Sequence, residues 1–274
     1  MSLDGGEQSR HKWYDHCKAT GRNKVLSEGA EELLGTEKVF AYFREQLLSG
    51  ALNAGDRLLG ERELALRLGV SRPVLRETLR SLAMLGFLDI RHGKGAYVRH
   101  ADVSVLTDFF TFCLAQQPDI LDDVMEARVA IECQAIRLAC DRASASDIER
   151  IGGLLQTLRE TLHDPVAGAE ADFAFHMALV EAGRSPALIM LYQSISELLR
   201  RSHVQRRRQT AFVPDIRDSL FEAHREVFLS IVERDGDAAD RRLRDHFAIG
   251  DELRRKSYIA AFTQSAATSR DKTI

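Results

Sequence analysis

Four residues in the second half of the chain have the types and spacing of a metal site. Asp172 and His176 lie four positions apart in the segment ADFAFH, which puts a carboxylate and an imidazole on one helical face. His224 and His246 lie among apolar positions of two later segments. Together they offer one oxygen and three imidazole nitrogens, a set suited to Zn²⁺ first and to Ni²⁺ or Mn²⁺ as alternatives. An Asp-His ion pair and two core histidines would give the same pattern, so spacing alone leaves both interpretations open.

A second group of residues, nearer the N-terminus, has the pattern of a DNA-reading surface. Two short predicted helices flank Gly69, and the hydroxyl of Ser71 can cap the second of them, which together indicates a helix-turn-helix. The second helix of this motif enters the major groove with its N-terminal residues nearest the bases, so Ser71, Arg72 and Arg76 are the candidate contacts. Arginine can pair two-fold with guanine O6 and N7. Arg62 starts the preceding helix and would lie near the phosphates, although each arginine taken singly could be a solvated surface charge.

The segments around this motif predict a winged helix. Two strand-like pieces surround the turn His92-Gly93-Lys94-Gly95, whose glycines let the backbone approach a sugar-phosphate rail or a minor groove. We therefore add His92, Gly93 and Lys94 to the candidate DNA contacts. The predicted elements are a helix over 37–48, helices over 61–68 and 72–85, and strands over 87–91 and 96–99.

After Arg99 the sequence predicts helices and no strand of any length. The segments are bounded by proline, glycine and capping residues, at 103–116, 119–142, 146–163, 166–182, 186–209, 215–234 and 237–262. We expect a mainly α protein, with an N-terminal winged helix-turn-helix and a C-terminal all-α bundle of six to seven helices. The expected organisation is a mobile leader over 1–35, a winged helix over 36–99, a linker and first helix over 100–117, a helical domain with the candidate metal site over 118–262, and a disordered tail over 263–274.

Composition places limits on this interpretation. The 274 residues are 45% hydrophobic and 29% charged, which is typical of a globular protein, and no stretch is apolar enough to predict a membrane span or a signal peptide. We expect a cytoplasmic protein with no membrane partner. The net charge of −3 is unevenly distributed, since residues 36–99 carry 11 Lys and Arg against 7 Asp and Glu. A basic head on an acidic body suits DNA binding but carries little weight alone.

The head resembles the GntR family of bacterial regulators along nearly its whole length. The resemblance rests on the runs GDRL, ERELA, LGVSR, VLRETL and HGKG between Gly55 and Gly95. It implies that the residues already named contact operator DNA. The chain departs from the family pattern at Leu59-Gly60, where Pro-Ser is usual, and at Pro73-Val74. The first departure weakens capping of the helix that follows, and the second removes a hydroxyl that could reach phosphate.

The body, over roughly 103–255, resembles the FCD domain of the FadR branch of that family. The resemblance implies that Asp172, His176, His224 and His246 hold one metal ion, and that a small organic acid binds beside it. Arg128 matches a family arginine that faces this cavity and can clamp a carboxylate. An intrahelical salt bridge with Glu132 is the alternative role for Arg128. Ser185 replaces the usual Asn before Pro186, and both residues cap helices well.

These observations favour a ligand-responsive regulator that binds operator DNA as a homodimer, because two-fold operators pair two heads. We interpret it as a repressor, with an activator as the alternative. A metal-dependent helical enzyme fused to a DNA-binding head is a rival, but no general base has a motif context. An architectural DNA-binding protein would leave the inward-facing polar groups unexplained. His163 and His203 have no partner at useful spacing and are expected at the surface, and Arg200, Arg201 and 206–208 are expected on a solvated or dimer-edge face.

Overall fold

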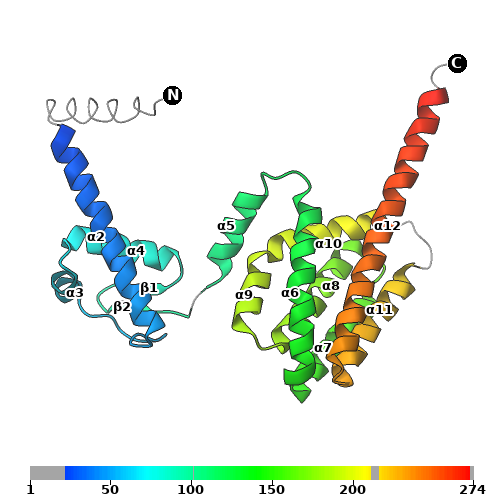
Figure 1. Ribbon diagram of the computed structural model, residues 1–274, viewed down its shortest axis with the longest axis horizontal. Helices are drawn as coiled ribbons and strands as arrows, with labels where there is room; N and C mark the ends of the chain where they lie inside the picture. The colour runs from blue at the N-terminus through cyan, green and yellow to red at the C-terminus, as the bar shows by residue number, and fades with distance from the viewer. Residues whose placement is uncertain (1–21, 101, 211–215, 272–274) are drawn as a thin grey trace, which may run out of the picture. The chain divides into compact units, whose positions relative to one another are not determined.

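The computed structural model describes residues 22–100, 102–210 and 216–271 of the chain. It divides into two compact units, with the boundary between Asp102 and Val103. We call the first unit the head and the second the body, and each is described by itself (Figure 1).

The head packs three helices against a small two-stranded sheet. Apolar side chains from all of these elements meet in one core, because each amphipathic helix turns its apolar stripe inward. The winged helix expected from the sequence is confirmed. Its elements are α2 (Arg22–Leu48), α3 (Glu61–Leu68), α4 (Arg72–Met84), β1 (Leu88–Arg91) and β2 (Gly95–Val98).

The turn between α3 and α4 is built by the residues that the sequence marked. Gly69 ends α3 in the left-handed conformation, with φ 63°, which a residue without Cβ adopts easily. Ser71 caps α4, since its Oγ accepts a hydrogen bond from Val74 N at 3.4 Å. Pro73 lies in the first turn of α4, where no intrahelical bond needs its missing N–H. Gly60 precedes α3 without any side-chain cap, as its departure from the family pattern suggests.

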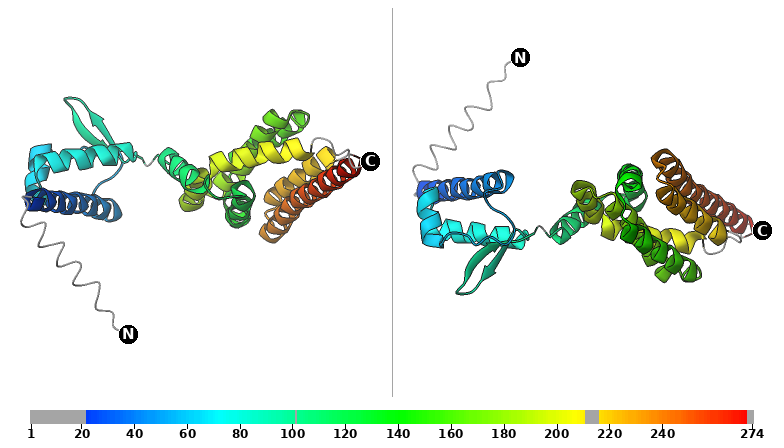
Figure 2. Two further views of the ribbon diagram at one scale, coloured as in Figure 1. Left: turned by 90° about the horizontal axis from the view of Figure 1, so that it is seen from above. Right: turned by 90° about the horizontal axis from the view of Figure 1, so that it is seen from below.

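The wing is an antiparallel hairpin. Leu88 pairs with Val98 at its base and Arg91 with Gly95 at its tip. Gly93 and Gly95 have φ values of 72° and 98°, which side-chain-bearing residues rarely adopt. Both views in Figure 2 show the hairpin standing out from the helices of the head.

The first helix begins earlier than expected. We predicted a helix from Glu37 after a leader over 1–35, but α2 starts at Arg22, and the rest of that leader lies outside the described residues. The run from Ala30 to Leu34 consists of good helix formers. Gly35 permits close packing of α2 on α4, because a Cβ there would meet Val74 Cγ1 at 3.0 Å.

The body is the all-α bundle expected from the sequence. None of the described helices is long and apolar enough to cross a membrane. The helices are α5 (Ser104–Leu114), α6 (Ile120–Arg142), α7 (Ala145–Glu160), α8 (Pro165–Ala182), α9 (Pro186–Ser194), α10 (Ser196–Thr210), α11 (Ile216–Val232) and α12 (Gly236–Asp271).

Helix α8 lies at the centre of the body. It packs against α6, α7 and α10, while α12 packs against α6 and α11. Buried residues occur on all sides of α8, as expected for a helix surrounded by others. Asp172 and His176 are among them, so polar groups on this helix must find partners inside the bundle.

Two helix boundaries in the body differ from the prediction. The single helix expected over 186–209 is divided into α9 and α10 at Ile195, where no glycine or proline marks the break. At the C-terminus the sequence predicts a disordered tail over 263–274, but α12 continues through residues 263–271 and ends at Asp271. Alanines at 266 and 267 continue the helix there, since alanine has the highest helix propensity.

Candidate functional site

Three histidines from three helices meet inside the body. His176 comes from α8, His224 from α11 and His246 from α12. One ring nitrogen of each lies within 4.8 Å of the others, and all three side chains are buried. The lone pairs of ring nitrogens gathered in this way can bind a shared proton or a metal ion.

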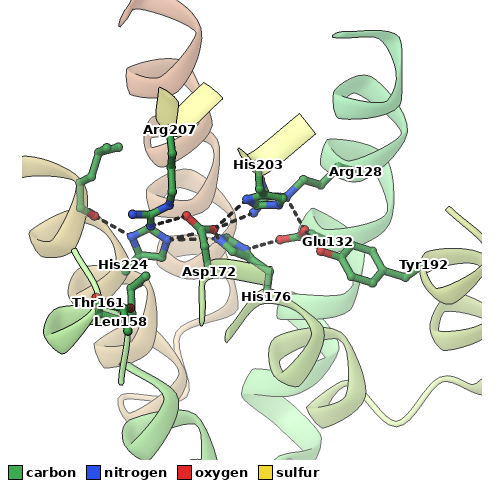
Figure 3. A network of polar contacts seen from close by, with 11 residues as sticks. Arg128, Glu132, Leu158, Thr161, Asp172, His176, Tyr192, His203, Arg207 and His224 are labelled. Carbon is green, nitrogen blue, oxygen red and sulfur yellow. Dashed lines mark hydrogen bonds and ion pairs between the residues drawn. The ribbon is translucent and has the colours of Figure 1, made fainter. Parts of the chain in front are cut away.

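The carboxylate of Asp172 joins this cluster. Its Oδ1 lies 3.4 Å from His176 Nε2 and 3.6 Å from His224 Nε2, and it has no hydrogen-bond partner although it is buried. Burial alone would raise the pKa of Asp172, but interactions with His203 and then His224 hold it well below its usual value. The group is therefore an anion with one oxygen aimed at the imidazoles (Figure 3).

Hydrogen bonds on the far side of two rings fix which nitrogen faces the cluster. His176 Nδ1 donates to Glu132 Oε2 at 2.6 Å, and His224 Nδ1 donates to Leu220 O at 2.7 Å, since a carboxylate and a carbonyl can only accept. The two Nε2 atoms then face each other at 3.3 Å. In neutral rings both carry lone pairs and no proton, so no hydrogen bond joins them, and a cation is what would satisfy them.

The protonation states agree with this. Burial lowers the pKa of His176 to about 4, with Arg128 adding to the effect. Burial, followed by the neighbouring His224, also lowers the pKa of His246 well below the usual value. Neutral imidazoles and an ionised carboxylate are the forms that ligate metals. The three histidines thus fit a divalent cation by their donor chemistry and burial, with Asp172 Oδ1 beside two of them, and His176 and His224 fit by the orientation of their rings as well.

Glu132 links the histidines to the arginine expected to bind an effector. Besides His176, it accepts from Arg128 Nε at 2.6 Å and from Tyr192 Oη at 2.8 Å. Burial alone would raise its pKa, but Arg128 and then His176 lower the pKa of Glu132 to about 2. The salt bridge weighed as the alternative role for Arg128 is therefore present, and it does not use the whole guanidinium.

Arg128 keeps donors directed at the cluster. Its side chain is 4% exposed, and its Nη2 has no hydrogen-bond partner while lying 3.9 Å from Asp172 Oδ1. The guanidinium also lies over the ring of Phe247, 4.7 Å from the centroid. A cavity of about 70 Å³ adjoins it, lined by residues that include Met125, Arg128, Asp172, His203, Arg207 and His246. An anionic ligand would meet a buried, oriented cation there.

In the head, all seven candidate DNA contacts are exposed. Ser71 and Arg72 start α4, and Arg76 lies one turn further along with its Nε 3.9 Å from Glu61 Oε2. The residues predicted from the second helix are Ser71, Arg72 and Arg76; Arg62 lies on α3, and His92, Gly93 and Lys94 form the wing turn.

Candidate DNA contacts from α4 and from the wing turn line one groove of about 330 Å³. It is lined by Arg76 from α4 and by His92 and Gly93 from the wing. Helix α4 and the wing thus line one surface of the head, which is the arrangement expected of a head that reads a DNA groove.

Comparisons with known proteins agree with both halves of this structure. Residues 36–98 match the model of the gntR family of bacterial regulatory proteins, and residues 123–248 match the FCD domain. A putative L-lactate dehydrogenase operon regulatory protein of Escherichia coli K12 is 34% identical over 72% of this chain and 77% of its own length. The chain belongs to the GntR family.

Further relatives of this GntR protein are also regulators. LutR of Bacillus subtilis is 27% identical over 72% of this chain and 91% of its own length. The galactonate operon transcriptional repressor of Escherichia coli K12 is 29% identical over 75% and 90%. The solved GntR protein of Streptococcus agalactiae, 24% identical, covers 80% of this chain and 99% of its own with a TM-score of 0.59, which supports the fold. The chain is a DNA-binding transcription regulator with an FCD effector domain, not an enzyme.

Helix α10 brings to the cluster two residues that sequence reasoning placed elsewhere. His203, expected at the surface, is 5% exposed, and its Nδ1 lies 3.3 Å from Asp172 Oδ1. Arg207, expected on a solvated or dimer-edge face, donates from Nη2 to Asp172 Oδ2 at 2.9 Å. Their four-residue spacing on one helix was the available signal. The expectation was wrong because the break at Ile195 sets the direction of α10, and nothing in the local sequence marks that break.

Proposed function

We propose that this regulator binds a divalent metal ion and a small carboxylate effector in its body, and that the effector controls binding of the head to operator DNA. Asp172, His176, His224 and His246 hold the metal, which is Zn²⁺ first, with Ni²⁺ or Mn²⁺ as alternatives. The observation that carries the proposal is the pair of Nε2 atoms facing each other at 3.3 Å with their protons fixed on the far nitrogens.

The bound metal supplies a positive centre that favours an anionic oxygen donor. Arg128 supplies the second anchor, because its buried Nη2 lacks a partner within reach. A buried unpaired donor is costly, and an acid recovers that cost where a neutral or apolar ligand does not. Two relatives are named as regulators of the L-lactate dehydrogenase operon and of the galactonate operon, which agrees with an organic acid as the effector.

Operator binding belongs to the exposed residues of the head. Arg72 and Arg76 read base edges from α4, Ser71 and Arg62 contact the backbone, and the wing turn of His92, Gly93 and Lys94 approaches the minor groove or the sugar-phosphate rail. The regulator acts as a homodimer, since one winged helix buries too little DNA for tight specific binding. The relative that regulates the galactonate operon is a repressor, which supports repression as the mode of action proposed for this chain.

Calorimetry tests the proposal with a panel of hydroxy, keto and sugar acids, on metal-loaded protein and on protein treated with a chelator. We expect an acid to bind the loaded protein, and chelation or Arg128→Ala to abolish most of that binding. Arg137→Ala is the matched control, because Arg137 is exposed on the same helix. Thermal melting confirms that Arg128→Ala is folded, and Arg128→Lys keeps the charge without the planar fork. Equal binding of the acid with and without metal would contradict the proposal.

A further inference from the structure

The cavity beside the candidate metal site holds a second guanidinium that the proposed function does not use. Arg207 reaches it from α10, whereas Arg128 reaches it from α6. Figure 3 shows the two side chains approaching Asp172 and the histidines from different elements. We infer, on the basis of the proposed function, that the effector is a small dianion with two carboxylates, and that Arg207 binds the second one.

The position of Arg207 is built into the neighbouring helix. A Cβ at position 168 of α8 would lie 2.8 Å from Thr161 O, so the backbone packing there requires glycine, and Arg207 Nη1 occupies the space that this leaves, 2.7 Å from where that Cβ would be. Gly168 is itself one turn before Asp172, whose Oδ2 accepts from Arg207. The slot at Gly168 and the bond to Asp172 hold a long side chain at the cavity, with 15% of it exposed.

The balance of formal charge asks for a dianion. The ion pairs of Arg128 with Glu132 and of Arg207 with Asp172 balance each other in charge, and imidazoles that hold a metal ion are neutral. A bound divalent cation leaves this buried group with an excess of two positive charges. One carboxylate would cancel half of that excess and a second would cancel the rest, which matters because uncompensated buried charge is strongly unfavourable.

Arg206 is a further charged side chain at the cavity, and it does not alter this balance of charge. Arg206 lines it as well, but its Nη1 lies 2.9 Å from Asp251 Oδ1 and its Nη2 lies 3.9 Å from Asp122 Oδ1. Arg207, in contrast, is paired with Asp172, which is also a candidate metal ligand. Asp172 faces the histidines through Oδ1 and Arg207 through Oδ2.

The donors of Arg207 allow it to serve two acceptors. A guanidinium carries five N–H groups in a planar fork, which can serve Asp172 Oδ2 and a carboxylate of the ligand together. The cavity is small, about 70 Å³, so the ligand must be short. A short-chain dicarboxylate is therefore the class of ligand that matches the charge.

Pairs of acids that differ only in the second carboxylate test this inference. The pairs are succinate with butyrate, malonate with propanoate, and malate with 2-hydroxybutyrate, in which a methyl group replaces one carboxylate. Calorimetry on the metal-loaded full-length protein is expected to show at least one diacid binding about tenfold or more tightly than its partner, the usual worth of a charge-assisted hydrogen bond. Metal content is measured before and after each titration to exclude removal of the ion by the acid.

Variants then assign the preference to Arg207. Arg207→Gln is expected to lower the affinity for the diacid about tenfold more than the affinity for the monoacid, which abolishes the preference, and Arg207→Lys is expected to retain part of it. Arg208→Gln is the control, since Arg208 is the adjacent residue and is exposed. If Arg207→Gln weakens diacid and monoacid equally, Arg207 only supports Asp172 and the inference is wrong.

The outcomes also separate this inference from the proposed function. Monoacids that bind as tightly as their diacids in all three pairs of the wild-type protein would overturn the second carboxylate site and leave a metal-dependent acid sensor intact. If no acid binds, or if binding ignores both the metal and Arg128, the proposed function itself fails, and the inference fails with it.

Discussion

Substitution of Glu132 by glutamine tests how the candidate metal site is held in shape. The carboxylate accepts from His176 Nδ1 and Arg128 Nε, both at 2.6 Å, and from Tyr192 Oη at 2.8 Å. An amide of the same shape keeps one acceptor oxygen and puts two N–H donors in place of the other. Either His176 Nδ1 or Arg128 Nε then faces the amide nitrogen, which is also a donor. The positive charge of Arg128 also loses its buried anionic partner.

The size of the effect follows from these contacts. Loss of a partner that orients a metal-bound histidine weakens metal affinity roughly 10- to 100-fold, or about 1.4–2.7 kcal/mol. Metal at 100 times its dissociation constant stabilises a protein by about 2.7 kcal/mol, and a tenfold weaker site reduces this to about 1.4 kcal/mol. Removing one partner of a buried ion pair costs a further ~3–5 kcal/mol of stability, with or without metal.

Thermal melting and a competing chromophoric chelator measure the two effects separately. The Tm measured in EDTA reports the loss of stability from the broken ion pair. The additional rise in Tm when metal is added reports the stabilisation by metal binding. Tyr192→Phe is the graded control, because it removes one hydrogen bond to Glu132 and leaves His176 and Arg128 bonded. A folded Glu132→Gln protein that binds metal as tightly as wild type would refute the role of Glu132 in orienting His176.

Two further predictions concern the head and the metal ligands. Arg72→Ala and Arg76→Ala should each weaken operator binding by about 1–3 kcal/mol and relax base selectivity, as measured by gel shift, with the exposed Arg201→Ala as control; unchanged selectivity in both would remove α4 as the reading helix. His224→Ala should lower the metal content found by elemental analysis and weaken the acid response far more than it weakens operator binding by metal-free protein, and the exposed His163→Ala should do neither. Full metal content in His224→Ala would contradict the site.

The head could be predicted almost element by element because its signals are local. A left-handed turn needs Gly69, a helix start needs the hydroxyl of Ser71, and a tight hairpin needs Gly93, and each requirement is met within a few residues. The start of α2 could not be placed in the same way. Gly35 has the character of a linker residue, and only its contact with Val74 reveals it as a packing position.

The candidate site was only partly predictable, for a related physical reason. Asp172 and His176 form a local pattern, whereas the environment of His203 and Arg207 depends on the direction in which α10 leaves Ile195. Glu132 was considered only as a partner of Arg128. Its second bond joins residues 44 positions apart in the sequence, and such a contact leaves no periodicity to detect.

Glu132 lies where it would couple the proposed metal site to the proposed acid site. The same carboxylate fixes the tautomer of His176 through Oε2 and the side chain of Arg128 through Oε1. A metal ion bound to His176 makes the Nδ1–H of that ring a stronger hydrogen-bond donor to Glu132 Oε2. This changes the strength of the bond between Glu132 Oε1 and Arg128 Nε. Because coupling between two ligands is reciprocal, an acid held by Arg128 must then tighten metal binding by the factor by which metal tightens acid binding. Glu132→Gln should reduce both factors together, whereas a site made of two independent halves would lose only metal affinity.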